Sequence, residues 1–469
     1  MLLTAILAYL IVTILVGFWA SRNVRNTNDF MLAGRSLPLL LGASALFATW
    51  FGSETVFGAS SQFLEGGLYQ VIEDPFGAAL CLLLFGMFFA RKLYGMRLLT
   101  LGDFFKVRYG RSTELVASIF LAPPYIGYIA AQLVAMGLIL NVVAGLVLWQ
   151  GIVVSALVVT IYTYIGGMWA ITITDFFQTL IIIGGLVVLA ISLGIEAGGI
   201  THVLASVPSE TFNFLPPPDF KEIVMYLAAW AVLGLGSIPS QDVFQRAMSS
   251  RSPGIAVWSC YIAAFLYLTV AMLPLFISLC IKHLYPEQIT GDTQLTLPNM
   301  VLMHMGLPVQ IIFFGSLLSA VMSTTSSAIL APASILSENV IRPLGRHRLS
   351  DRQLLLFTRV GVLIFSGLAT VMATMRSNIY ELVGESSILS LVSLFAPLVF
   401  GLYWKGSSSG GALLSMVLGM LTWIIFEFYD TGWPALVPAT LVSIAAMVAG
   451  SVIWPKKEKH DKDRTQSIE

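Results

Sequence analysis

The feature that most constrains this chain is a series of long apolar stretches joined by short polar connections. A helix that crosses a bilayer needs about 20 mostly apolar residues. Only 11% of the residues are charged, whereas soluble domains have about 25%. We therefore predict an all-α integral membrane protein with about 13 transmembrane helices. The apolar stretches cover residues 3–21, 38–63, 75–96, 114–140, 143–165, 168–195, 222–245, 254–281, 306–339, 354–375, 379–403, 409–428 and 433–454.

Basic residues are distributed unevenly between alternate connections, which indicates how the chain crosses the membrane. Lys and Arg concentrate on the cytoplasmic side of membrane proteins. If the N-terminus is outside, the exterior connections carry only Lys221, Lys282 and Arg376, and the other 22 of the 25 basic residues are cytoplasmic. We predict a multi-pass protein of the plasma membrane, specifically a bacterial inner membrane, with its N-terminus outside and its C-terminus in the cytoplasm.

Several classes of protein are excluded by composition and motifs. The 25 basic residues balance 25 acidic ones, and no basic domain stands apart, so we expect no nucleic-acid partner. The five histidines are scattered without a His-Glu-x-x-His motif, and we expect neither an enzyme nor an organic cofactor. A channel would show a repeated pore segment or rings of charge. The sequence has neither, so we do not expect a channel. We expect a monomer that contacts membrane lipid, with a disordered cytoplasmic tail at 455–469 whose lysines touch anionic lipid.

Two of the apolar stretches contain residues that interrupt helices. Small polar residues surround Glu54 in the second stretch, and Gly234, Gly236 and Pro239 weaken the helix in the seventh. The two interruptions lie five spans apart, as expected when two five-helix repeats of opposite topology enclose a binding site between broken helices. We predict an extra N-terminal helix at 1–33, repeats at 34–195 (helices 2–6) and 196–405 (helices 7–11), helices 12 and 13 at 406–454, and the tail at 455–469.

Three carboxylates within apolar stretches are candidate functional groups, because charged groups are costly there and indicate function by default. Glu54 lies in the second stretch, and Asp175 lies in the sixth. Asp242 lies near the cytoplasmic end of the seventh stretch and close to Arg246. We interpret Asp242 as one half of an interfacial salt bridge with Arg246.

The ninth stretch is rich in hydroxyl groups, with six Ser and Thr residues between Ser319 and Ser327. Residues three and four apart share a helix face, so Ser323, Ser326 and Ser327 line up. Oxygen ligands are what small hard cations prefer. The alternative is that these hydroxyls only pack helices together or bond back to carbonyls.

Four motifs occur along the chain, namely Gly34-Arg35-Ser36-Leu37, Tyr164-Ile165-Gly166-Gly167 followed by Thr174-Asp175, Gln241 with Phe244-Gln245-Arg246, and Ala320-Val321-Met322-Ser323-Thr324. In this order and spacing they resemble the sodium/solute symporter family, which includes proline, sugar, sialic acid and high-affinity choline transporters. The resemblance covers residues 5–450 and implies an inverted five-plus-five repeat, preceded by one helix and followed by two. It also implies sodium-coupled symport of a small molecule by alternating access.

The resemblance also implies two sites for the coupling ion, Na⁺. The main sodium site consists of the backbone carbonyls of Ala48, Phe51 and Ala320 with the hydroxyls of Ser323 and Thr324. A second sodium site, present in some family members, maps onto Asp175, Ser323, Ser326 and Ser327. The chain has this whole set, so two sodium ions per cycle is our hypothesis.

The substrate site implied by the resemblance is only partly that of the choline branch. Trp50 and Tyr128 match aromatic substrate contacts of the choline and proline transporters, whereas two other aromatic positions of the choline branch hold Ala78 and Ser240 here. A carboxylate at Glu54 beside Trp50 would pair with an ammonium group, and aromatic faces attract cations. We therefore expect a small amine-bearing solute. The candidate substrate-binding residues are Trp50, Ser53, Glu54, Tyr128, Ser240 and Gln241.

Three alternative functions stay open at the level of sequence. Asp175 or Glu54 could carry a proton, which would make the protein a proton-coupled carrier. The same solute could also cross without coupling to an ion. A transporter-like substrate sensor is the third alternative, although the fifteen-residue tail offers no signalling module.

Overall fold

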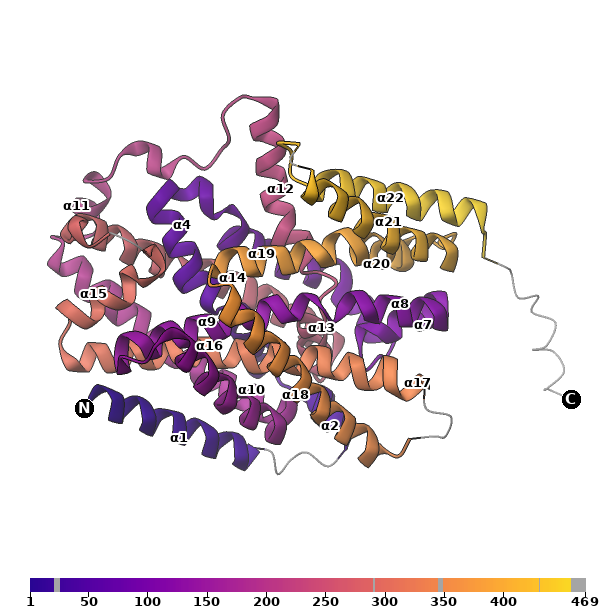
Figure 1. Cartoon of the computed structure of the whole chain (residues 1–469), viewed down its shortest axis with the longest axis horizontal. Coiled ribbons are helices and arrows are strands. Elements are labelled where there is room, and N and C mark those ends of the chain that lie inside the picture. Colours follow the sequence, from indigo (N-terminus) through magenta and orange to yellow (C-terminus); the bar gives the residue numbers. More distant parts are fainter. Residues whose placement is uncertain (21–25, 290–291, 345–348, 430, 457–469) are drawn as a thin grey trace, which may run out of the picture.

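The computed structural model describes residues 1–20, 26–289, 292–344, 349–429 and 431–456. The described chain is helical, and its only extended pairing is an isolated bridge between Leu37 and Ser250. Figure 1 shows that many of the long helices, such as α1, α16 and α22, run along the long axis of the molecule. The predicted all-α class is confirmed. Most of the predicted tail, residues 457–469, lies outside the described residues.

The helices follow one another with short connections throughout the chain. Up to residue 196 they are α1 (Leu2–Ala20), α2 (Thr27–Leu32), η2 (Ala33–Arg35), α3 (Leu39–Trp50), η3 (Glu54–Gly58), α4 (Ala59–Gly66), η4 (Gly67–Val71), η5 (Ile72–Gly77), α5 (Ala78–Leu84), η6 (Phe85–Ala90), α6 (Arg91–Gly95), α7 (Leu101–Tyr109), α8 (Arg111–Leu121), α9 (Pro124–Ala144) and α10 (Leu148–Glu196). After it they are α11 (Ile200–Ala205), η7 (Ser209–Phe212), α12 (Phe220–Gly236), α13 (Gln241–Ser249), α14 (Pro253–Leu284), η8 (Pro286–Gln288), η9 (Thr293–Leu295), α15 (Thr296–His304), α16 (Leu307–Ile335), η10 (Leu336–Ile341), α17 (Arg342–Leu344), α18 (Asp351–Met375), α19 (Ile379–Ser390), η11 (Leu391–Phe395), α20 (Ala396–Tyr403), α21 (Ser409–Phe428) and α22 (Leu436–Ile453).

The described residues form ten helices that are long and apolar enough to cross a membrane, or eleven if the bent pair α12–α13 is one span. A multi-pass membrane protein is thus confirmed. The helical run Glu54–Gly95 covers parts of two predicted stretches, and neither α1 nor the short helix α3 belongs to the ten. The count of thirteen spans stays a prediction.

The centre of the molecule is built around α16 and α9. Every residue of α16 from Phe313 to Ile335 is buried, and most of α9 is buried as well. A helix that is apolar on all sides must be covered by other helices, and α16 packs against α9, α10 and α3. By contrast, α21 and α22 pack mainly on each other and expose large apolar side chains such as Leu421 and Val452.

Both predicted helix interruptions are present. Helix α3 ends at Trp50, Phe51 leaves helical geometry (φ −74°, ψ 81°), and a π-helical turn resumes at Glu54. Helix α12 ends at Gly236, and α13 continues at an angle of 48°. A third break separates two predicted spans inside α10, where Gly167 has φ 55° and ψ −163°. The positive φ suits glycine because it lacks a Cβ.

Candidate functional site

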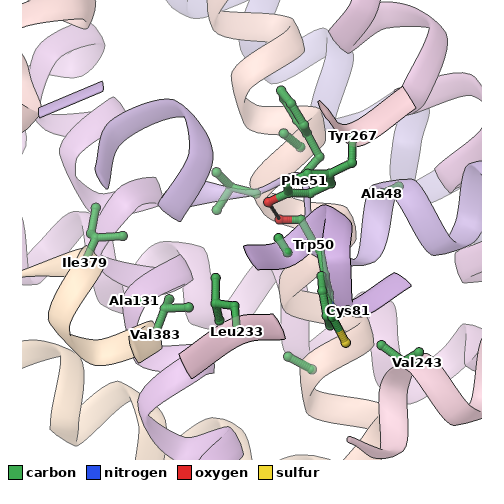
Figure 2. Packing of buried hydrophobic residues seen from close by; sticks show 14 of the residues in the cluster. Ala48, Trp50, Phe51, Cys81, Ala131, Leu233, Val243, Tyr267, Ile379 and Val383 are labelled. Atoms are coloured by element: carbon green, nitrogen blue, oxygen red, sulfur yellow. Dashed lines mark hydrogen bonds between the residues drawn. The ribbon is translucent and has the colours of Figure 1, made fainter. Parts of the chain in front are cut away.

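The broken end of α3 is held by side chains from three other helices. The last carbonyls of a helix have no partner within the helix. Here the Ala48 carbonyl oxygen lies within hydrogen-bond distance of two hydroxyls of α16, the Thr49 carbonyl oxygen lies 3.2 Å from the hydroxyl of Tyr128 on α9, and the Trp50 carbonyl oxygen lies 3.1 Å from the hydroxyl of Tyr267 on α14. Figure 2 shows the Tyr267 hydroxyl directed at Trp50. These contacts stabilise the break, which places carbonyl oxygens in the protein interior.

The hydroxyls of Ser323 and Thr324 meet this end of α3. Ser323 Oγ lies 3.2 Å and Thr324 Oγ1 lies 3.1 Å from the carbonyl oxygen of Ala48. Thr324 Oγ1 also lies 3.1 Å from the Ala320 carbonyl oxygen. The structure thus brings together four of the five residues predicted for the main sodium site. The fifth, Phe51, lies at the end of α3, where the backbone leaves the helix.

A second group of polar side chains adjoins the first through Asp175 of α10. Asp175 Oδ1 accepts a hydrogen bond from Ser323, and Asp175 Oδ2 lies 3.9 Å from Nη2 of Arg246. Arg246 is fully buried and donates to the Ser327 hydroxyl. Ser326 Oγ donates to the carbonyl of Ser323, on its own helix (2.9 Å). The four residues predicted for the second sodium site therefore lie in one cluster, with a buried guanidinium at its edge.

Glu54 begins the second half of the broken span and is buried. Tyr128 of α9 donates to Glu54 Oε1 (3.1 Å), and Gln132 Nε2 donates to Glu54 Oε2 (2.8 Å). Gln132 Oε1 accepts from the Ser53 backbone N–H (3.0 Å), which fixes the chain just after the break. Gly52 fits closely in this turn, since an added Cβ would lie 2.7 Å from Gln132 Oε1 and 2.8 Å from Thr324 Oγ1. The turn therefore touches both the carboxylate network and the hydroxyl cluster.

A cavity lies between the two broken helices and α9, α14 and α19. Four of the six predicted substrate-binding residues line it, namely Trp50, Glu54, Tyr128 and Ser240. Ser53 and Gln241 are buried outside the lining, and Gln241 Oε1 accepts from the Leu101 backbone N–H (2.7 Å). The full lining is Trp50, Glu54, Ala78, Pro124, Tyr125, Tyr128, Leu233, Gly236, Ser237, Ser240, Asp242, Tyr267, Val383, Ser386, Ser387 and Ser390.

The interpretation of Asp242 as an interfacial salt-bridge partner of Arg246 is wrong. Asp242 lines the cavity, where its Oδ1 accepts a hydrogen bond from Tyr125 (2.7 Å) and its backbone N–H donates to the same hydroxyl oxygen (3.0 Å). Arg246 pairs with Asp175 instead. Because α13 begins only at Gln241, Asp242 lies in the first turn after the break and faces α9.

Sequence reasoning missed three residues that shape the cavity or hold its walls: Tyr125, Gln132 and Tyr267. Tyr125, Tyr128 and Gln132 lie three and four residues apart, on one face of α9, and this spacing after Pro123 and Pro124 was a usable signal. Tyr267 lies in the middle of an otherwise apolar helix, where its hydroxyl donates to Asp74 Oδ1 (2.7 Å). A single tyrosine in an apolar stretch carries no such pattern.

A cavity buried among membrane-spanning helices, between two that are interrupted, defines a membrane transporter. The model of the sodium:solute symporter family matches residues 30–419, and the chain belongs to this family. The protein is therefore a sodium-coupled solute symporter and not an enzyme.

Individual relatives agree with this membership. The chain is 30% identical to the human high affinity choline transporter 1 over 444 residues, which cover 89% of this chain and 75% of the relative. It is 26% identical to the osmoregulated proline transporter OpuE of Bacillus subtilis (strain 168) over 483 residues, covering 96% and 94%.

Among solved structures, a substrate-bound, outward-open Na⁺-coupled sialic acid symporter superposes with a TM-score of 0.87. The superposition covers 97% of this chain and 98% of that one, at 17% identity. The closed form of Mhp1, a nucleobase-cation-symport-1 family transporter, gives a TM-score of 0.55 at 16% identity. At these identities the likeness concerns the fold alone.

Proposed function

We propose that this protein takes up a small amine-bearing organic solute together with sodium by alternating access. The observation that carries the proposal is the cavity between the broken helices, which presents Glu54 and aromatic walls beside the hydroxyl cluster at Ala48. Sodium bound there would hold α3 against α16 and pre-order the turn at Gly52, so that the substrate binds more tightly. Linkage requires that the substrate strengthens sodium binding by the same factor.

The main sodium site in this proposal uses the carbonyls of Ala48, Phe51 and Ala320 with the hydroxyls of Ser323 and Thr324. Two features favour a cation here. The negative end of the α3 dipole points into the cluster, and neutral oxygens are the ligands that a small hard cation prefers. Unwound carbonyls and helix ends of this kind coordinate sodium in transporters with broken helices.

A second sodium ion is proposed at Asp175, Ser323, Ser326 and Ser327. Asp175 Oδ2 is buried without a hydrogen-bond partner among the described residues, and a buried carboxylate oxygen without a partner is costly. A cation beside it would remove that cost. Arg246, 3.9 Å away, already balances part of the Asp175 charge.

The cavity chemistry supports an amine as the substrate. None of the described lining residues is Lys, Arg or His, whereas Glu54 and Asp242 both face the cavity. Trp50 with Tyr125, Tyr128 and Tyr267 adds aromatic walls, which attract cations by their ring faces. A solute with a negative charge would meet repulsion from the two carboxylates.

The number of membrane spans and the division of the chain into repeats are part of the same proposal. We place thirteen spans in the chain, with inverted repeats at 34–195 and 196–405, an extra helix before them and two after them. The breaks in α3–η3 and α12–α13 support this division, because each would lie in the first helix of its repeat. In Figure 1, α1 starts and α22 ends at opposite ends of the long axis, as an odd number of crossings requires.

The distribution of basic residues supports an outside N-terminus and a cytoplasmic C-terminus, and the short connections between the spans favour a bacterial inner membrane. The exposed apolar faces of α21 and α22 suit contact with lipid. We propose that the protein functions as a monomer.

Thermal unfolding of the purified protein in sodium or potassium buffer, with amines, betaines, amino acids, sugars and carboxylates in turn, tests this proposal. We expect amines to raise the Tm only when sodium is present. Stabilisation by amines that is equal in potassium would favour an uncoupled or proton-coupled carrier, or a sensor. Sodium-dependent stabilisation by sugars or carboxylates alone would reject the amine.

A further inference from the structure

We infer that the preferred substrate is a dication, a short diamine whose two ammonium groups are bound by Glu54 and Asp242. This inference rests on the proposed function and deepens it by naming the substrate class. The two carboxylates come from different broken helices, η3 and α13, and both line the cavity. Glu54 is 3% exposed and Asp242 is 2% exposed, so each charge is almost fully shielded from bulk water.

Each carboxylate is oriented by its own tyrosine of α9. Tyr128 donates to Glu54 Oε1 (3.1 Å), and Tyr125 donates to Asp242 Oδ1 (2.7 Å). The two tyrosines are three residues apart, which places them about 4.5 Å apart along the helix axis. The two carboxylates are therefore held by neighbouring residues of one helix and form two anionic positions in one cavity, so we expect a short linker between the two ammonium groups.

The charge balance of the cavity favours two positive charges over one. None of the described lining residues is basic, and the nearby Arg246 directs its Nη2 to Asp175 and Ser327, while its Nε and Nη1 have no hydrogen-bond partner among the described residues. A buried charge without a partner is strongly unfavourable. A monocation that pairs with Glu54 would leave Asp242 with the Tyr125 hydroxyl and the N-terminus of α13, which compensate a full charge only in part.

The apolar part of the cavity lining suits the linker of a diamine. Trp50, Leu233 and Val383 contribute apolar surface to the cavity, and Figure 2 shows Leu233 and Val383 near one another. Tyr125 and Tyr128 present ring surface from α9, so that each ammonium group would lie near an aromatic ring as well as a carboxylate.

The test uses the full-length purified protein in sodium buffer and a matched series of probes. The diamines are 1,2-diaminoethane, 1,3-diaminopropane and 1,4-diaminobutane. The controls are n-butylamine and choline, which carry one positive charge each, and 4-aminobutyrate, which carries one positive and one negative charge. We expect the best diamine to produce half-maximal thermal stabilisation at a concentration at least tenfold below that of any control. A control that stabilises as well as every diamine would overturn the inference.

Two variants separate the roles of the carboxylates. Asp242→Asn should abolish the diamine preference, so that 1,3-diaminopropane and n-butylamine stabilise at similar concentrations. The matched variant Glu287→Gln, which removes one exposed negative charge outside the cavity, should keep the preference. A diamine preference that survives in Asp242→Asn would overturn the role of Asp242.

The outcome also distinguishes this inference from the proposed function. If monoamines stabilise the protein in sodium as well as diamines do, the amine symporter stands and the dication is rejected. If no amine of either kind stabilises it in sodium, both are rejected.

Discussion

Single hydroxyl groups on α16 decide how tightly the interior holds sodium in our proposal. Thr324 bridges the carbonyls of Ala48 and Ala320, at 3.1 Å from each. We predict that Thr324→Ala raises the sodium concentration for half-maximal uptake by about tenfold, which corresponds to the loss of about 1.4 kcal/mol of binding free energy. Uptake by proteoliposomes, measured over a range of sodium concentrations, checks this.

The control for Thr324→Ala is its neighbour Thr325. Thr325 is equally buried, but its hydroxyl bonds back to the Val321 carbonyl on its own helix. Thr325→Ala should leave the sodium dependence close to that of the wild type. Identical sodium curves for all three proteins would remove Thr324 from the ion site.

Glu54 supports the second prediction at the residue scale. Glu54→Gln keeps the size of the side chain but removes its charge. Since a hydrogen bond to a charged group contributes about 1.5–3 kcal/mol, we expect amine affinity to fall by about 10- to 100-fold. Sodium-dependent thermal stabilisation by amines measures the change. Wild-type affinity in the variant would assign Glu54 a structural role through Gln132 and Tyr128.

The candidate residues show which parts of a site can be predicted from sequence. Ser323 and Thr324 could be matched to Ala48 because the motifs keep their order and spacing. The partner of Asp242 could not, because the choice between Arg246 and Tyr125 depends on where the chain bends after Pro239. Asp242 and Arg246 lie four residues apart on α13, so helical periodicity permits their pairing, and only the tertiary packing of α13 directs Asp242 to α9 and Arg246 to α10.

At the scale of elements, the break between α12 and α13 depends on a close approach to α19. A Cβ added at Gly236 would lie 2.5 Å from the carbonyl oxygen of Ser387. We predict that Gly236→Ala destabilises the protein, because overpacking costs about 1–3 kcal/mol, and that it weakens substrate binding because Gly236 lines the cavity. The Tm with and without sodium and amine measures both effects.

Gly234, one half-turn away, provides the matched control. Its added Cβ would meet the end of the flexible Leu80 side chain at 3.2 Å. Gly234→Ala should therefore resemble the wild type in Tm and in amine binding. If both variants behave alike, the contact between α12 and α19 does not position the cavity.

The positions of the two helix breaks could be predicted from the sequence, whereas the number of membrane spans could not be settled. Gly and Pro weaken helices wherever they occur in a chain, so Gly236 and Pro239 marked the second break directly. Span boundaries depend on tertiary packing instead. The helical run Glu54–Gly95 passes through two apolar stretches, although Glu65, Gly66 and Gly67 mark the connection between them in the sequence.

For the whole molecule, the number of sodium ions per substrate sets how far the solute can be accumulated. A membrane potential of 100 mV contributes about 2.3 kcal/mol for each charge moved inward, which corresponds to roughly 50-fold accumulation per sodium ion. A second ion would raise this factor to roughly 2,500. The cluster at Asp175 and Arg246 is therefore decisive for the energetics of transport.

We predict that two sodium ions enter with each substrate molecule, one at the Ala48 cluster and one at Asp175. Simultaneous uptake of ²²Na⁺ and labelled amine by proteoliposomes gives the ratio directly. Ser326→Ala should lower it from two toward one, because it removes a proposed ligand but leaves the Arg246–Asp175 pair intact. Thr325→Ala should keep the wild-type ratio. A ratio of one in the wild type would mean that the buried guanidinium of Arg246 alone neutralises Asp175, and that a single ion drives the cycle.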